Sequence, residues 1–307
     1  MRRIAWSAAL TLAIGMVGWL LGSAALSESD TGREGAGPEW NVILISWDGT
    51  QRAHLMELYE QGLLSNLAAL AQEGTAMPME VRGHATDTKA GHAEILTGYG
   101  PEVTGVYSNR RFRAIPDGLT LFERLKARFG QGVATVAITG KRGNLLEILE
   151  NALPELDFAL IRGATAERNG PLMLRALETL RDRAFFAFFH FSDPDHAGHN
   201  HGEDSREYSA AIQLCDRWLG EVVSKLKELG IYERTLIYIS TDHGFDEGRR
   251  SHLNAPDIWF VTNDPLVRPL PDGVATQRNI APTILERLGF DLSSLEPPLP
   301  GRSLLHP

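Results

Sequence analysis

Residues 41–46 read NVILIS and lead directly into Trp47-Asp48-Gly49. A short apolar run of this kind is typical of a strand that is buried on both faces of a parallel sheet. Asp48 then follows the carboxyl end of the strand. In open α/β sheets, ligands bind beyond the carboxyl ends of the strands, so the stretch predicts a buried strand with a functional carboxylate at its end.

Other apolar runs end in the same way. Residues 185–191 (FFAFFHF) lead to Asp193-Pro194-Asp195, and residues 235–240 (TLIYIS) lead to Thr241-Asp242-His243-Gly244. Further strands are predicted at 133–138 and 258–261, and helices at 52–72, 120–129, 166–181, 203–229 and 280–288. Strands that alternate with helices predict an α/β fold, a doubly wound and mostly parallel sheet flanked by helices. Asp48, Asp195 and Asp242 should then meet at one edge.

Composition narrows the class of protein. The chain has 307 residues, of which 43% are hydrophobic and 22% charged, as in an ordinary globular protein. The formal net charge of -9 argues against general nucleic-acid binding, which needs a basic surface. Cys215 is the single cysteine, so an intramolecular disulfide and a cysteine zinc site are both excluded. Its helical spacing with apolar neighbours predicts a core position.

The N-terminus predicts export. Arg2 and Arg3 precede a run without charged residues, 4–26, which contains the small residues Ser23-Ala24-Ala25 near its end. Residues 1–27 are therefore interpreted as a signal peptide or a membrane anchor, and both readings stay open. Residues 28–39 are polar and predict a linker, and residues 40–307 predict a single catalytic domain. The expected location is periplasmic or extracellular, with attachment to the inner membrane through 4–26 as the alternative.

The stretch 86–109 (TDTKAGHAEILTGYGPEVTGVYSN) adds a hydroxyl to the carboxylates. A helix begins near Thr88, so the Thr88 hydroxyl should lie near free N–H groups and the positive end of the helix dipole. The candidate metal ligands are Asp48, Asp195, His199, Asp242, His243 and His252. Three carboxylates, three imidazoles and one hydroxyl are the groups that a two-metal hydrolytic site requires.

Each of these groups also has a plain structural explanation. Asp195 and His199 are spaced i, i+4 and would share one face of a helical turn, but such pairs are common in polar loops. His252 alone would be an exposed histidine, and Thr88 alone would be a helix N-cap. The prediction therefore depends on the set as a whole.

The order of these motifs resembles that of the alkaline phosphatase superfamily, and within it the type I phosphodiesterase/nucleotide pyrophosphatase branch with a threonine nucleophile and two zinc ions. The resemblance runs from about Val42 to the C-terminal helix. It implies one zinc ion on Asp48, Thr88, Asp242 and His243, and another on Asp195, His199 and His252. It also implies a covalent phospho-threonine at Thr88, a phosphate contact from Asn109 and a supporting, non-ligand role for His92.

The resemblance implies an enzyme that hydrolyses small phosphate esters, with phosphodiesters as the first expectation. Lys141 resembles a lysine with which related monoesterases bind additional phosphate charge, so a phosphomonoesterase is the alternative. Lys141 would otherwise be a solvated loop residue, and Lys89 could supply the charge instead. A sulfatase is disfavoured because Thr88 stands where sulfatases need Cys or Ser. A phosphoethanolamine-type transferase and a non-catalytic zinc-binding relative stay open, as does the oligomeric state.

Overall fold

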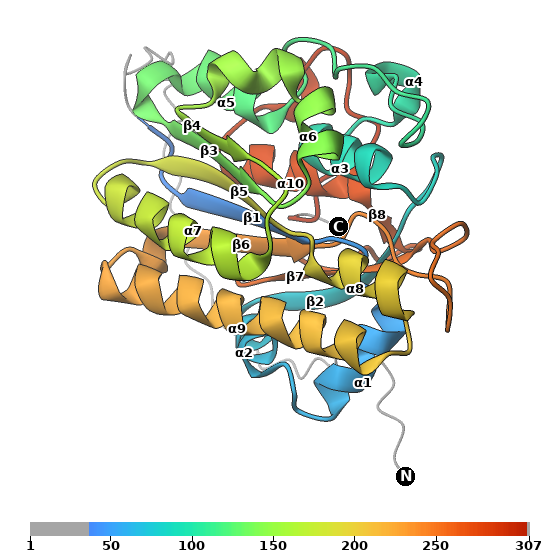
Figure 1. Cartoon of the computed structure of the whole chain (residues 1–307). Coiled ribbons are helices and arrows are strands. Elements are labelled where there is room, and N and C mark those ends of the chain that lie inside the picture. Colours follow the sequence, from blue (N-terminus) through green and yellow to red (C-terminus); the bar gives the residue numbers. More distant parts are fainter. Residues whose placement is uncertain (1–36, 306–307) are drawn as a thin grey trace, which may run out of the picture. The chain divides into compact units, whose positions relative to one another are not determined.

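A computed structural model describes residues 37–305 of the chain (Figure 1). The predicted signal peptide or anchor, residues 1–27, and most of the predicted linker, residues 28–39, lie outside these residues. Within 37–305, no helix is both long and apolar enough to cross a membrane.

One sheet of eight strands organises the described part of the chain. Its order is β4-β3-β5-β1-β6-β7-β2-β8. The strands are β1 (Asn41–Trp47), β2 (Thr75–Glu80), β3 (Ala134–Thr139), β4 (Phe158–Ile161), β5 (Phe185–Phe191), β6 (Thr235–Ser240), β7 (Asp257–Thr262) and β8 (Ala275–Thr276). The strand order does not follow the sequence, because the intervening helices carry the chain across the faces of the sheet.

The predicted 41–46 strand lies in the interior of this sheet as β1. Ile43 pairs with Ala187 of β5 on one side and with Ile237 of β6 on the other, both in parallel register. All seven residues of β1 are buried, as the apolar run predicts. The parallel arrangement continues through β3 and β4. β7 runs antiparallel to both β6 and β2, so the sheet is mixed but mostly parallel.

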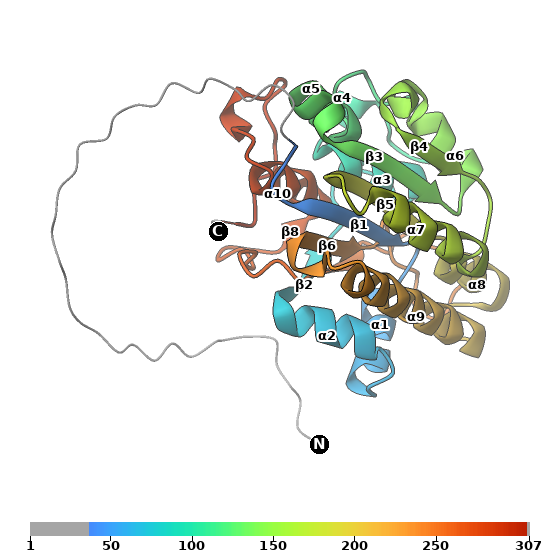
Figure 2. The same cartoon turned by 90° about the vertical axis from the view of Figure 1, so that its left-hand side faces the viewer.

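Helices cover both faces of the sheet, which confirms the predicted fold class (Figures 1 and 2). They are α1 (Arg52–Glu60), α2 (Ser65–Glu73), α3 (Thr88–Thr97), α4 (Pro101–Thr104), α5 (Leu121–Phe129), α6 (Arg142–Ile148), α7 (Ala166–Leu180), α8 (Asp193–His201), α9 (Arg206–Glu228) and α10 (Ile280–Arg287). Helices α1, α2, α7 and α9 bury one face, and α3, α5, α6 and α10 bury the other.

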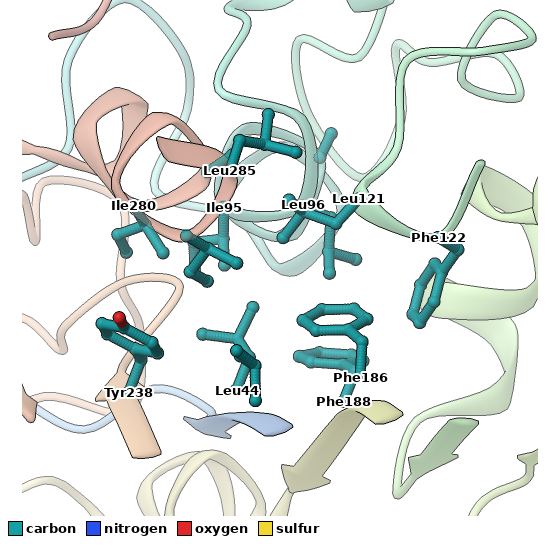
Figure 3. Close-up of a cluster of buried hydrophobic side chains, with 14 of the residues drawn as sticks. Leu44, Ile95, Leu96, Leu121, Phe122, Phe186, Phe188, Tyr238, Ile280 and Leu285 are labelled. Atoms are coloured by element: carbon teal, nitrogen blue, oxygen red, sulfur yellow. The ribbon is translucent and has the colours of Figure 1, made fainter. Parts of the chain in front are cut away.

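The α3 side of the core fixes the position of helix α3. Leu44 of β1 and Phe188 of β5 pack beneath Ile95 and Leu96 of α3, as Figure 3 shows. All four side chains are at most 1% exposed. Burying each large apolar side chain contributes roughly 1.5–3 kcal/mol. The start of α3, where Thr88 lies, is thereby held against the sheet.

Some predicted elements were wrong or missing. The helix predicted over 52–72 is two helices, α1 and α2, because the chain turns at Gly62 with a φ of 73°. Strands β2, β4 and β8 were not predicted: β2 contains Pro78 and charged or polar ends, β4 is a partly exposed edge strand, and β8 has two residues. Residues 193–201, whose sequence is consistent with either a helical turn or a polar loop, form helix α8.

Candidate active site

Four neighbouring parallel strands bring most of the predicted site together. Strands β3, β5, β1 and β6 lie side by side in that order, and their carboxyl ends share one edge. The chain reaches Lys141 after β3, Asp195 after β5, Asp48 after β1, and Asp242 and His243 after β6. The convergence expected from the sequence is therefore present in the fold.

Three of these residues form what we call the first cluster: Asp48, Asp242 and His243. All three are 0% exposed. The Nε2 atom of His243 lies 3.3 Å from Asp242 Oδ2 and 3.7 Å from Asp48 Oδ1. Asp242 Oδ1 accepts the Gly49 N–H at 3.0 Å, whereas Asp242 Oδ2 and His243 Nε2 are buried without a hydrogen-bond partner. Buried atoms of this kind normally have a partner.

The second cluster consists of Asp195, His199 and His252. Asp195 and His199 lie one turn apart on α8, and His252 lies in the loop between β6 and β7. Asp195 Oδ1 lies 3.4 Å from His199 Nε2 and 3.8 Å from His252 Nε2, and it too is buried without a hydrogen-bond partner. The two Nε2 atoms are 3.1 Å apart.

The backbone fixes the tautomer of all three histidines in the two clusters. Each Nδ1 faces a carbonyl oxygen: His243 faces Gly244 at 2.8 Å, His199 faces Arg250 at 2.9 Å and His252 faces Thr86 at 2.6 Å. A carbonyl only accepts, so each Nδ1 must donate its proton. The three Nε2 atoms therefore present lone pairs to the clusters, as histidines that bind metals do.

Both clusters fit a divalent metal ion. Zinc bonds of roughly 2.0–2.1 Å in a tetrahedron place neighbouring ligand atoms about 3.3–3.4 Å apart. The separations of 3.3 and 3.7 Å in the first cluster and of 3.1, 3.4 and 3.8 Å in the second lie close to this value. Two imidazole lone pairs that face each other at 3.1 Å also need a cation between them. The clusters adjoin, because His243 Nε2 lies 3.8 Å from Asp195 Oδ1.

His190, which the sequence analysis missed, holds Asp48 in place. His190 Nδ1 accepts the Gly140 N–H at 3.1 Å, so Nε2 carries the proton and donates to Asp48 Oδ2 at 2.9 Å. This leaves Asp48 Oδ1 for the first cluster. The signal was present in the sequence, since His190 is the only polar residue in the run FFAFFHF.

His92 supports the site without joining it. Its Nδ1 lies 2.8 Å from the Thr88 carbonyl, and its Nε2 lies 2.9 Å from Ser46 Oγ. Burial lowers the pKa of His92 to about 3, so the ring is neutral. With both nitrogens engaged, His92 has no free lone pair, in keeping with the supporting role that the resemblance implied.

Thr88 is the first residue of α3 and is 1% exposed, with Asp87 as the N-cap. Lys141 Nζ lies 3.1 Å from the Thr88 hydroxyl, 2.9 Å from Asp48 Oδ1 and 2.6 Å from Asp195 Oδ2. Burial by itself lowers the pKa of Lys141, but Asp48, Asp195 and Asp242 outweigh it and raise that pKa above its ordinary value. Lys141 is thus a buried ammonium that joins the two clusters, and not a solvated loop residue.

The Asn109 side chain binds the start of α3 at Lys89, the residue that follows Thr88. Its Oδ1 accepts the Lys89 N–H at 3.0 Å and the side-chain amide of Asn144 at 3.1 Å. Two donors on one atom identify that atom as the oxygen, so Nδ2 is the other end. Lys89 itself turns to Glu147 and lies over the Phe112 ring, 3.2 Å from its centroid. Lys89 is therefore not the residue that supplies positive charge beside Thr88.

A cavity of about 410 Å³ joins these groups. It is lined by Thr88, Asn109, Gly140, Lys141, Gly143, Asn144, Gly163, Asp195, His196, His199 and His252. A ligand in this cavity can contact the Thr88 hydroxyl, the Lys141 ammonium and the second cluster at the same time. The lining is polar or glycine throughout, which suits a small, charged ligand.

Comparisons with known proteins agree with this geometry. The sequence profile of the "Type I phosphodiesterase / nucleotide pyrophosphatase" family matches residues 42–144 and 146–280. Bis(5'-adenosyl)-triphosphatase ENPP4 from Pongo abelii is 24% identical over 230 residues, which are 71% of this chain and 50% of that protein. This chain spans half or less of the length of the first curated relatives that it matches.

Solved structures share the fold at lower identity. A 2-O GAG sulfatase superposes with a TM-score of 0.65 at 15% identity, covering 87% of this chain and 73% of that one. A protein of the alkaline phosphatase superfamily from Vibrio parahaemolyticus superposes with a TM-score of 0.58 at 18% identity, covering 89% and 71%. At these identities the likeness concerns the fold. The profile match over most of the chain shows that this protein belongs to the type I phosphodiesterase/nucleotide pyrophosphatase family.

Proposed function

We propose that this protein is a phosphoric ester hydrolase that uses Thr88 as its nucleophile and two divalent metal ions, most simply Zn²⁺. One observation carries the proposal: the Thr88 hydroxyl opens into the same cavity as the second cluster and lies beside a buried ammonium that also contacts the first cluster. Membership of the family supports the choice of a phosphate ester as substrate.

The ligand sets follow from the two clusters. Asp48, Asp242 and His243, together with Thr88, would hold one ion, and Asp195, His199 and His252 the other. Bound there, such ions lower the pKa of a hydroxyl and stabilise the developing charge on a leaving oxygen. The chain's own contribution is to fix the ligands: His190 orients Asp48, and three backbone carbonyls orient the three imidazoles.

Thr88 would attack phosphorus in line. Its Oγ–P bond forms while the bond from phosphorus to the leaving oxygen breaks, which gives a phospho-threonine and an alcohol or alkoxide. Water then attacks the same phosphorus, the Oγ–P bond breaks, and the phosphate product leaves while Thr88 Oγ takes back a proton. Lys141, 3.1 Å from Thr88 Oγ1, favours the ionised hydroxyl because an adjacent positive charge stabilises an anion.

Asn109 would bind a non-bridging phosphoryl oxygen. Lys89 N–H and Asn144 hold its oxygen, which leaves its Nδ2 as the donor, and Asn109 lines the cavity. A donor of this kind needs no reorganisation when charge moves onto the phosphoryl oxygens. Loss of one such donor costs about 3 kcal/mol of transition-state stabilisation in comparable sites.

The buried Lys141 also favours a second candidate, a phosphomonoesterase. Three carboxylates and one ammonium give the site two formal negative charges, and two divalent ions would convert these into two positive charges. A dianionic phosphomonoester would neutralise such a site fully, whereas a monoanionic diester would do so only in part. The family points to the diester and the charge count to the monoester.

Hydrolysis of p-nitrophenyl phosphate and bis-p-nitrophenyl phosphate by the zinc-loaded protein decides between these two. We expect activity on at least one of them, and we expect Lys141→Met to reduce monoester hydrolysis more than diester hydrolysis. Arg142→Met, one residue further on and more exposed, is the matched control. Zinc binding without hydrolysis of either ester would contradict the hydrolase and favour a transferase or a non-catalytic zinc-binding relative.

We also propose that the protein is exported. The two arginines and the uncharged run 4–26 support this, although they lie outside the described residues. Fractionation of cells that express the full chain should find it outside the cytoplasm, and a chain without residues 1–27 should stay in the cytoplasm. Retention of both chains in the cytoplasm would contradict export.

A further inference from the structure

The loop between β6 and β7 does more for the second cluster than carry His252. The carbonyl of Arg250, in the same loop, accepts the Nδ1–H of His199 at 2.9 Å. His252 Nδ1 in turn donates to the Thr86 carbonyl at 2.6 Å. Both imidazoles of the second cluster therefore owe their orientation to the position of this loop.

Asp246 gives the loop its shape. Its Oδ2 accepts from Ser251 Oγ and from the Leu253 N–H, both at 2.9 Å, and its Oδ1 accepts from the Asn254 N–H at 2.9 Å. These bonds close residues 246–254 into one compact turn. They lie within the loop, however, and do not fix it relative to α8, which carries Asp195 and His199.

Glu203, in the connection between α8 and α9, supplies that link. Its carboxylate Oε2 accepts the Gly248 N–H at 2.9 Å, and its own N–H donates to the Arg249 carbonyl at 2.9 Å. Two hydrogen bonds thus clamp the residues directly before Arg250. The Glu203 side chain is 5% exposed, so water competes little for these bonds.

Glu203 is itself held from the opposite side. Its Oε1 accepts the Nδ1–H of His54 on α1 at 3.0 Å, and His54 Nε2 lies 2.8 Å from Ser209 Oγ on α9. The Glu203 carboxylate therefore connects the packed helices α1 and α9 to the loop between β6 and β7. None of these residues lines the cavity beside Thr88.

We propose that Glu203 is a positioning residue for the second cluster. It holds residues 248–249 so that the Arg250 carbonyl and His252 keep both Nε2 lone pairs aimed at one ion beside Asp195. This inference rests on the proposed role of the second cluster as a metal site. It assigns no contact between Glu203 and substrate or metal.

The test is zinc binding by the metal-free full-length chain, measured by titration calorimetry against a competing chelator. We expect the wild type to bind two ions and Glu203→Ala to bind one of them 10–100-fold more weakly, the usual cost of removing an outer partner of a metal ligand. The affinity for the other zinc ion should be unchanged. Glu207→Ala, an exposed glutamate in the first turn of α9, is the matched control and should behave as wild type.

A conservative variant separates positioning from charge. In Glu203→Gln, the amide oxygen can still accept the Gly248 N–H if the amide N–H₂ donates to His54 and His54 donates from Nε2 to Ser209. Zinc affinity should then stay within about threefold of wild type. His54→Leu keeps the contact between Glu203 and Gly248 but removes the hydrogen bond that holds the Glu203 carboxylate from the other side. This variant should weaken binding of the same zinc ion by less than Glu203→Ala does. If Glu203→Ala does not fold, His54→Leu tests the positioning role in its place.

The outcomes separate this inference from the proposed function. The positioning role would be overturned if both Glu203→Ala and His54→Leu bound two zinc ions as tightly as wild type, or if the affinities for both ions fell equally. Either result would leave the hydrolase proposal intact. Equal weakening in Glu203→Gln and Glu203→Ala would overturn it as well, because charge alone would then explain the loss. A wild type that binds no zinc would overturn the proposed metal site itself.

Discussion

The two clusters of the site are built in different ways. In the first cluster, Asp48, Asp242 and His243 follow two adjacent parallel strands directly and are completely buried. In the second cluster, Asp195 is buried, but 43% of the His199 side chain is exposed, and His252 lies in a loop. The sheet that makes the fold thus also makes the first cluster, whereas the second depends on α8 and on the anchoring of a loop. We therefore expect a change in either cluster to weaken the ion that this cluster would hold and to leave the other ion in place.

The largest expected effect comes from Asp242→Asn in the first cluster. The variant keeps an acceptor for Gly49 but replaces the free Oδ2 by an amide N–H₂, which cannot bind a cation. Hydrolysis should fall at least about a thousandfold, since metal-ion stabilisation supplies several kcal/mol of the barrier reduction. Initial rates with excess zinc measure the loss. Two ions bound with wild-type affinity would show that Asp242 is not a ligand.

A smaller effect is expected for His199→Ala in the second cluster. One zinc step should weaken by at least about 100-fold, because an imidazole ligand is lost. The metal-free protein should unfold within about 0.5 kcal/mol of wild type, as is usual for a partly exposed side chain. Calorimetric zinc titration and urea unfolding measure the two quantities. If His199→Ala bound neither zinc ion, the two clusters would not be separate metal sites.

His190→Phe tests the support of the first cluster from within the sheet. Phenylalanine suits the apolar strand β5, but Asp48 Oδ2 loses the donor that fixes it. Zinc affinity at the first cluster should fall 10–100-fold while the fold is retained. Circular dichroism controls for folding. Unchanged affinity would mean that Gly49 and the strand ends alone fix the cluster.

The smallest effect concerns pH and the anchor of the second cluster. Burial raises the pKa of Glu203, but hydrogen bonds from His54 and Gly248 outweigh it and hold that pKa below its ordinary value of 4.5. Because the folded-state pKa is the lower one, this stabilisation is present above about pH 4.5 and is lost as pH falls through the folded pKa. Urea unfolding of the metal-free proteins should show a steeper loss below about pH 4.5 in wild type than in Glu203→Gln. Equal slopes would contradict an ionised anchor.

The difference between the clusters also explains what could be predicted from the sequence. Asp48 and Asp242 follow uninterrupted apolar strands, so the pattern placed them at the sheet edge. Asp195 and His199 share one face only because residues 193–201 form helix α8. The polar sequence of this segment was also consistent with a loop. His252 had no local signal of its own, so the sequence supported it only as a member of the whole set of candidate ligands and through the family resemblance.

Support residues were the hardest to predict. His190 stands out locally as the polar residue of an apolar strand, but both His190 and Glu203 act through hydrogen bonds to residues far away in the chain, and local periodicity does not identify those partners. Lys141 followed a predicted strand, but its contact with two carboxylates depends on β3, β5 and β1 being neighbours. Strand order is a property of the whole fold, and the alternation of strands and helices predicts the class of fold without predicting that order.

The most direct test of the account is hydrolysis by Thr88→Ala and Thr88→Ser with excess zinc. Serine keeps a hydroxyl at the start of α3, so Thr88→Ser should retain measurable activity on the preferred p-nitrophenyl ester. Thr88→Ala should fall to the level of a blank without enzyme, while still binding zinc at the second cluster. Activity of Thr88→Ala within about tenfold of wild type, a loss of only 1.4 kcal/mol, would show that another group attacks phosphorus.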